Sequence, residues 1–180
     1  MSKPLEEIVI GPDRALFWLD GNGVWHNADG PIAHKRIARY LHRCIRRDAK
    51  GYYVGQIREK VREKVYFRYA DTALFALDLL REDPIALLLN TGRHVRLRPK
   101  NLTIEHDALY MHVGAERIKF TPRCLIKIAE LLEEDAAGDY IRIKDRRYRI
   151  RQRSVAPAEK TVHDHGPPVA ARRKNPCTKC

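Results

Sequence analysis

The sequence lacks any uninterrupted apolar run near the roughly 20 residues that a membrane-spanning helix needs. Its charged opening, MSKPLEEIV, has no apolar signal core. Four cysteines in 180 residues are too few for a disulfide-stapled secreted domain. These absences predict a soluble, cytoplasmic protein with no membrane partner, and an apolar fraction of 44% is enough for a globular interior.

The sequence also lacks the motifs of common catalytic and nucleotide-binding sites. It has no G-x-S-x-G, P-loop, G-x-G-x-x-G or H-E-x-x-H pattern. Cys44 and Cys124 lie in apolar helical patterns without a Cys-His-acid arrangement, which favours buried thiols over nucleophiles. We therefore expect no catalytic residues and no cofactor, and an unrecognised enzyme stays open as an alternative.

Positive charge is concentrated at one end of the chain. The formal charge is +12, and residues 141–180 hold 12 Lys/Arg and 3 Asp/Glu, a net of +9. The first 140 residues therefore carry 23 basic and 20 acidic residues, only +3. The overall charge is thus no evidence that the folded body binds nucleic acid.

Residues 154–180 are rich in Pro, Ala and charge, which predicts a disordered basic tail. The tail holds four zinc-type donors, His163, His165, Cys177 and Cys180. Its H-x-H spacing is shorter than the usual H-x3-5-H, and the last ligand would be the last residue. We therefore predict no metal site there.

A first helix is predicted after the segment VWHNADGP. Gly30 or Asp29 can cap it, Pro31 suits its first position, and Gly51 lies beyond its end. The expected apolar stripe consists of Ile37, Leu41, Cys44 and Ile45. His34 and His42 would lie roughly 12 Å apart along the axis, too far to share a zinc ion. We expect both histidines to face solvent on a basic helix face.

A second segment repeats this plan. LYMHV at 109–113 is followed by TPRCLIKIAELLEED at 121–135 and DAAGDYI at 135–141, matching VWH, the first helix and DAKGYYV at 48–54. Thr121 is the expected cap, Pro122 the first helical residue, and Gly138 lies beyond the end. The match predicts two similar strand–helix–strand units.

The segment between these units predicts strands. Val65, Phe67 and Tyr69 alternate with polar neighbours, and IALLLN and HVRLR flank the turn Asn90-Thr91-Gly92 as a hairpin. TALFALDLLRE, residues 72–82, fits either a helix or a buried strand, and its pattern leaves both open.

Together these patterns predict an α+β fold. Two similar strand–helix–strand units are joined by a central antiparallel β-meander and followed by the disordered basic tail. The expected divisions are an extension at 1–14, a first unit at 15–60, the meander and second unit at 61–153, and the tail at 154–180.

Three segments follow one another in a suggestive order: DGNGVWHNADGPI at 20–32, EKVYFRYAD at 63–71 and LNTGRHV at 89–95. They resemble motifs of a bacterial family of unknown function, domain of unknown function 1285. The resemblance implies a compact two-domain α+β protein with repeated motifs and a strand at 73–80. It also implies a ligand cleft and a signalling or regulatory role. The chain departs from the second motif at Ala70, Ala73 and Leu74.

The favoured function is a non-catalytic ligand-binding or regulatory module for a small anion. The site would lie near the first helix start, where free N–H groups favour anions. Its candidate residues are Trp25, His26, Glu63, Lys64, Asp71 and Asn90. Structural roles are the alternative, with Trp25 in the core and Asn90 in a turn.

A further alternative is binding of nucleic acid or an acidic protein through the segment 142–153. In a strand its arginines would align on one face, where they could meet phosphates. These residues are Arg147, Arg149, Arg151 and Arg153. The competing interpretation is an edge strand kept soluble by its charge.

Overall fold

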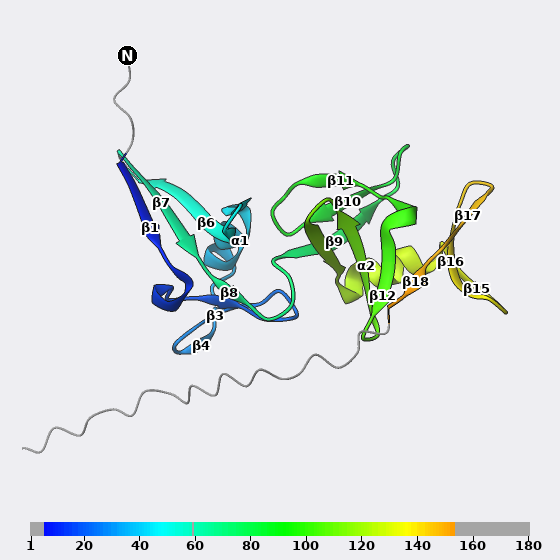
Figure 1. Cartoon of the computed structure of the whole chain (residues 1–180), viewed down its shortest axis with the longest axis horizontal. Coiled ribbons are helices and arrows are strands. Elements are labelled where there is room, and N and C mark those ends of the chain that lie inside the picture. The colour runs from blue at the N-terminus through cyan, green and yellow to red at the C-terminus, as the bar shows by residue number, and fades with distance from the viewer. Residues whose placement is uncertain (1–5, 59, 154–180) are drawn as a thin grey trace, which may run out of the picture.

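The computed structural model describes residues 6–58 and 60–153, and within them strands predominate. Two α-helices, α1 (Lys35–Arg43) and α2 (Pro122–Ala129), pack against the sheets, which agrees with the expected α+β class. We call residues 6–69 the first lobe and residues 70–153 the second lobe. The first lobe lies at the left of Figure 1 and the second at the right.

The first lobe contains two four-stranded sheets. The larger has the order β1-β7-β6-β5 and consists of β1 (Glu6–Ile10), β5 (Ile45–Asp48), β6 (Gly51–Arg58) and β7 (Val61–Tyr66). The smaller has the order β4-β3-β2-β8 and consists of β2 (Trp18–Leu19), β3 (Trp25–Asn27), β4 (Gly30–Pro31) and β8 (Arg68–Tyr69). A short 3-10 helix, Pro12–Arg14, follows β1.

The second lobe is built on a seven-stranded sheet of order β11-β10-β9-β14-β13-β12-β18. Its strands are β9 (Leu74–Leu80), β10 (Ala86–Leu89), β11 (His94–Arg96), β12 (Leu102–Glu105), β13 (Ala108–Val113), β14 (Glu116–Phe120) and β18 (Arg151–Gln152). A 3-10 helix, Pro99–Asn101, precedes β12. A separate three-stranded sheet contains β15 (Leu132–Asp135), β16 (Gly138–Ile143) and β17 (Arg146–Arg149).

The hairpin β6–β7 spans residue 60, so strands on both sides of the expected boundary at 60 and 61 pair in one sheet. Residues 6–10 of the expected N-terminal extension form β1, which pairs in parallel with β7. The tail at 154–180 lies outside the described residues. No helix in the described part of the chain is long and apolar enough to cross a membrane.

The first helix starts later than the sequence predicts. Pro31 lies in β4, where a proline is tolerated at the edge of a sheet. The cap is His34, whose ring nitrogen accepts a hydrogen bond from the Ile37 N–H at 3.4 Å. The helix ends at Arg43, and Gly51, with a φ of 126°, belongs to the β5–β6 turn instead of a helix stop.

The second helix begins as predicted and ends early. Thr121 caps it through the Cys124 N–H, and Pro122 is its first residue. After Ala129 the chain forms β15, and Asp135 pairs with Gly138 across a two-residue turn. The DA-x-G motif therefore makes a hairpin turn at both places, because Asp48 pairs with Gly51 in the same way.

The ambiguous segment is a strand, as the resemblance implied. β9 lies between β10 and β14 in the centre of the large sheet and buries Leu74, Phe75, Ala76 and Leu79. The expected hairpin of 85–90 and 94–98 is confirmed as β10–β11. One cluster of buried side chains runs from Leu19 and Trp25 through β9 to Ile128, so both lobes share one core.

Candidate functional site

The six residues predicted to bind a ligand do not meet in one place. Trp25 is 1% exposed and packs edge-on against Phe17 and Phe67. Glu63 accepts a hydrogen bond from the Gln56 amide, and Lys64 lies 3.2 Å from Glu7 on the next strand. These contacts give Trp25, Glu63 and Lys64 structural roles in the first lobe.

His26 contacts groups close to it in sequence. Its Nε2 lies 3.1 Å from an oxygen of Asp20, and its ring stacks on Trp18 with centroids 4.3 Å apart. Asp20 also accepts from two backbone N–H groups of the turn, at Asn22 and Val24. Although burial opposes ionisation, these bonds keep the pKa of Asp20 below its ordinary value.

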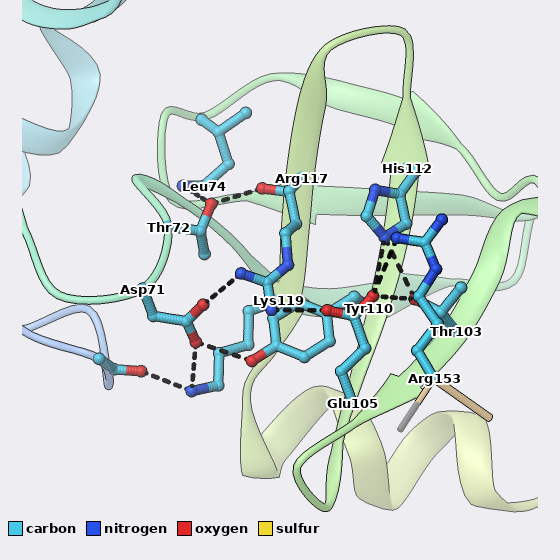
Figure 2. A network of polar contacts seen from close by, with 11 residues as sticks. Asp71, Thr72, Leu74, Thr103, Glu105, Tyr110, His112, Arg117, Lys119 and Arg153 are labelled. Atoms are coloured by element: carbon cyan, nitrogen blue, oxygen red, sulfur yellow. Dashed lines mark hydrogen bonds and ion pairs between the residues drawn. The ribbon is translucent and has the colours of Figure 1, made fainter. Parts of the chain in front are cut away.

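Asp71 joins a polar network on the face of the large sheet (Figure 2). Its carboxylate accepts from the Tyr110 hydroxyl at 2.7 Å and pairs with Arg117 at 2.7 Å and Lys119 at 2.8 Å. Burial favours the neutral acid, yet these hydrogen bonds and charges lower the pKa of Asp71. Lys119 also donates to the Gly21 carbonyl at 2.8 Å, so the network ties the lobes together.

The network continues to Glu105, which is 5% exposed. Glu105 accepts from Arg117 at 2.9 Å and from Thr103 at 3.0 Å, and His112 lies 3.3 Å away (Figure 2). Its buried carboxylate is thus fully engaged by protein groups. Although Arg117 Nε is buried without a hydrogen-bond partner among the described residues, charges that are paired with one another fit a structural joint better than a ligand site.

Asn90 is the second joint between the lobes. Its side chain accepts from the Phe75 N–H at 3.1 Å, donates to the Ala73 carbonyl at 3.0 Å, and lies 3.0 Å from Nδ1 of His42. The prediction that His42 faces solvent is wrong, because its ring packs against Trp25 with centroids 5.5 Å apart. Burial lowers the pKa of His42 to about 4, although a hydrogen bond with the Gly23 backbone opposes the shift.

A cavity of about 550 Å³ lies next to this joint. One wall comes from the end of α1 and from β5 and β6, and the other from the β10–β11 turn and the start of β14. The lining residues are Arg43, Ile45, Arg46, Arg47, Tyr52, Leu74, Thr91, Gly92, Arg93 and Glu116. This cavity lies at the C-terminal end of α1, whereas the sequence predicts a site near the start of that helix.

Four arginines and one carboxylate give this cavity its charge. Arg93 pairs with Glu116 through its two terminal guanidinium nitrogens, at 3.1 and 3.3 Å. Arg46 donates to the Arg43 and Ile45 carbonyls at 2.7 and 2.8 Å, which offsets the negative end of the helix dipole. Arg43 and Arg47 make no ion pair with any described residue, so two cationic side chains are available to an anion.

Tyr52 adds a neutral donor to the lining. It is 7% exposed, and its hydroxyl has no hydrogen-bond partner among the described residues. Burial, followed by the charge of Glu116, raises the pKa of Tyr52 to about 12, and Arg47 and Arg93 act on it in the opposite direction. The hydroxyl therefore stays protonated at neutral pH, close to the charged groups of the cavity.

The arginines of segment 142–153 do not form a single row. Buried Ile150 separates β17 from β18, which belong to different sheets. Arg149 pairs with Asp135 at 2.8 Å, and Arg153 lies 3.7 Å from Glu105. Arg147 lies over the Tyr140 ring at 5.0 Å, and Arg151 is exposed.

The described residues contain no cluster of three His, Cys, Asp or Glu side chains arranged for a metal ion. The four zinc-type donors of the tail, His163, His165, Cys177 and Cys180, lie outside the described residues. Within the described part, Cys124 is fully buried and Cys44 partly buried. Burial raises the pKa of Cys124 to about 12, which suits a core thiol and not a nucleophile.

No family model and no curated protein matches the chain. Among solved structures, a DUF1285 family protein from Silicibacter pomeroyi DSS-3 matches with a TM-score of 0.57 and 14% identity, covering 82% of this chain and 84% of that one. The chain resembles DUF1285 proteins. A second such protein, from Shewanella baltica OS155, matches with a TM-score of 0.47 and 16% identity over 64% of this chain and 91% of that one. The predicted resemblance is confirmed, and at this identity the likeness to DUF1285 concerns the fold.

Proposed function

We propose that the chain is a non-catalytic module that binds a small anion in the cavity between its lobes. The observation that carries the proposal is that Arg43 and Arg47, which make no ion pair with a described residue, line the same cavity as Tyr52, whose buried hydroxyl has no hydrogen-bond partner among the described residues. Native proteins rarely leave a buried hydroxyl without a partner, and functional sites are a common exception. Charge-assisted hydrogen bonds from arginine suit carboxylate and phosphate groups.

The lining also supports a binding role without catalysis. Among the described residues that line the cavity, Glu116 is the one carboxylate, and no histidine or cysteine is present. Glu116 is held by Arg93, so the cavity offers no pair of acid and base groups of the kind that proton-transfer catalysis needs.

We also infer that the lobes derive from one duplicated unit. The interval from helix cap to turn glycine is the same in both, from His34 to Gly51 and from Thr121 to Gly138. The three strands just before each helix are antiparallel, β2–β4 and β12–β14, and so are the three just after it, β5–β7 and β15–β17. A last short strand then pairs in parallel with the first of the preceding three, β8 with β2 and β18 with β12. Gly51→Ala and Gly138→Ala should destabilise the protein to a similar extent, because both glycines have a positive φ. Gly11→Ala is the control and should not destabilise the protein, because Gly11 has an ordinary φ and free space around it. Unequal losses of stability in the two turn variants would count against duplication.

Aligning the two units shows where they differ in charge, because the first lobe supplies three of the four arginines that line the cavity. At equal distances from the caps, the first lobe has Arg43, Arg46 and Arg47 where the second has Glu130, Glu133 and Glu134. Two of these glutamates are neutralised in place, Glu130 by Arg81 and Glu133 by Arg142. Anion binding is accordingly a property of the first lobe and its junction.

Isothermal titration with inorganic phosphate tests the proposal. Arg43→Gln and Arg47→Gln should each weaken binding roughly 10- to 100-fold, since a charged hydrogen bond contributes roughly 1.5–3 kcal/mol. Arg147→Gln, on the exposed β17, is the matched control and should leave the affinity unchanged. Loss of binding in Arg147→Gln alone, or binding of neither inorganic phosphate nor any phosphate-bearing compound by the unmodified protein, would contradict the cavity assignment. Binding of nucleic acid or an acidic protein through residues 142–153 stays a separate prediction.

A further inference from the structure

We infer that the ligand of this cavity is an organic phosphate ester with a hydroxyl-bearing body, and not a free inorganic anion. The inference rests on the proposed anion-binding function and assigns a separate task to Glu116. The arginines and Tyr52 would hold the phosphate group, while Glu116 and the apolar floor would hold the rest of the molecule.

The size of the cavity is the first argument. Its volume of about 550 Å³ falls in the range of pockets for organic ligands, which is roughly 300–1,000 Å³. Inorganic phosphate takes the space of only a few water molecules, each about 30 Å³. A free phosphate would therefore leave most of the cavity to solvent, whereas an ester with a carbon body would fill it.

The floor of the cavity is the second argument. Ile45 and Leu74 line it and are only 4% and 1% exposed, so most of their carbon surface is already buried and a bound molecule would cover the small remainder beside the arginines. The Tyr52 ring adds to this surface, although Arg47 lies 5.5 Å from its centroid. A purely ionic ligand gains nothing from such a surface, while a carbon skeleton is stabilised by leaving water.

Glu116 is the third argument. The Glu116 carboxylate would repel a phosphate group. We therefore infer that it contacts a different part of the ligand. Arg93 occupies two of the roughly four acceptor positions of a carboxylate, and the others can accept from ligand hydroxyl groups. Arg43 and Arg47 together match the charge of a phosphate monoester, about −1.5 to −2 at pH 7.

Titration with four probes tests the inference: inorganic phosphate, ribose 5-phosphate, adenosine 5′-monophosphate and adenosine. We expect at least one ester to bind ten or more times tighter than phosphate and adenosine not to bind. In Glu116→Gln the affinity for phosphate should rise, because a repelling charge is removed, and the preference for the ester should fall several-fold. Glu130→Gln, on an exposed ion pair outside the cavity, is the control and should keep both affinities.

The outcomes separate the two proposals. Equal affinity for phosphate and both esters would overturn the ester inference and leave anion binding standing. A preference for the ester that Glu116→Gln does not reduce would overturn the assignment of Glu116. Absence of binding by all probes would overturn both proposals. Because the preference is a ratio measured within one protein sample, partial unfolding of a variant does not affect it, and the unmodified protein decides the ligand class if Glu116→Gln does not fold.

Discussion

The amide nitrogen of Asn90 lies 3.0 Å from Nδ1 of His42, and this contact joins the two lobes beside the cavity. The next residues along the chain, Thr91 and Arg43, line opposite walls of the cavity. Asn90 and His42 are therefore positioning residues: they fix how far apart the arginines of the first lobe and Arg93 of the second lobe stand.

Asn90→Ala should destabilise the protein by about 2–4 kcal/mol, because it leaves the buried Phe75 N–H and Ala73 carbonyl without their side-chain partner. Urea denaturation measures the change. Asn22→Ala is the control, since that side chain is exposed, and should change stability by less than about 0.5 kcal/mol. Equal stabilities of the two variants would show that the Asn90 joint contributes little.

His42 should make stability depend on pH. Its folded pKa, about 4, is below the ordinary 6.5, so the neutral ring is favoured by folding. Its contribution is complete above pH 6.5 and is lost as pH falls toward 4, with a loss of about 2 kcal/mol expected at pH 5. Denaturation at pH 7.5 and pH 5 measures this loss of stability. The loss should be absent in His42→Gln and should remain in the control His94→Gln, because the His94 side chain is exposed. If His42→Gln loses as much stability between pH 7.5 and pH 5 as the unmodified protein, the pH dependence comes from other groups.

Asp71→Asn should destabilise the protein strongly, by about 2–4 kcal/mol, because Lys119 would lose its counter-charge in a partly buried place and Arg117 would keep only Glu105. Asp83→Asn removes the partner of Lys144 in a pair that is mostly exposed, so little change is expected. Chemical denaturation of both variants gives the comparison. A small cost at Asp71 would mean that solvent screens the network shown in Figure 2.

Tyr52→Phe should act in opposite directions on stability and binding. Removing an unpartnered buried hydroxyl should stabilise the free protein by up to about 1 kcal/mol. The same change should weaken phosphate binding three- to tenfold, because a donor is lost. Tyr66→Phe is the control: it removes a bond to Asp48 at 2.8 Å, so it should lower the melting temperature slightly and keep binding. A parallel loss of stability and binding in Tyr52→Phe would indicate a structural hydroxyl.

Helix starts and hairpin turns could be predicted from the sequence because contacts between residues close in sequence determine them. Thr121 and Pro122 start α2 as expected, and Asn90-Thr91-Gly92 turns the β10–β11 hairpin. The strand at β9 required the family resemblance, since its composition suits a helix and burial between two strands overrides that propensity.

Other features depend on tertiary contacts that local sequence does not carry. Pro31 is typical of a helix start, yet pairing with β3 places it in a strand. His42 has the spacing of a surface residue, and only the approach of Trp25 and Asn90 buries it. The cavity combines Arg43 and Arg47 with Arg93, which is far away in the sequence. In the sequence alone, Arg43, Arg46 and Arg47 near a helix end are typical of a solvated face. The sequence does carry one signal for these arginines: at equal distances from the two helix caps, the first unit has RCIRRD where the second has ELLEED.

The most direct test of the account is the position of a bound heavy anion in a crystal. Crystals soaked in tungstate, a phosphate-like oxyanion, should show their strongest anomalous peak inside the cavity. That peak should lie within hydrogen-bonding distance of the Tyr52 hydroxyl and of Arg43 or Arg47. Peaks only along residues 146–153, or no ordered tungsten at the cavity, would contradict the assignment of anion binding to the junction between the lobes.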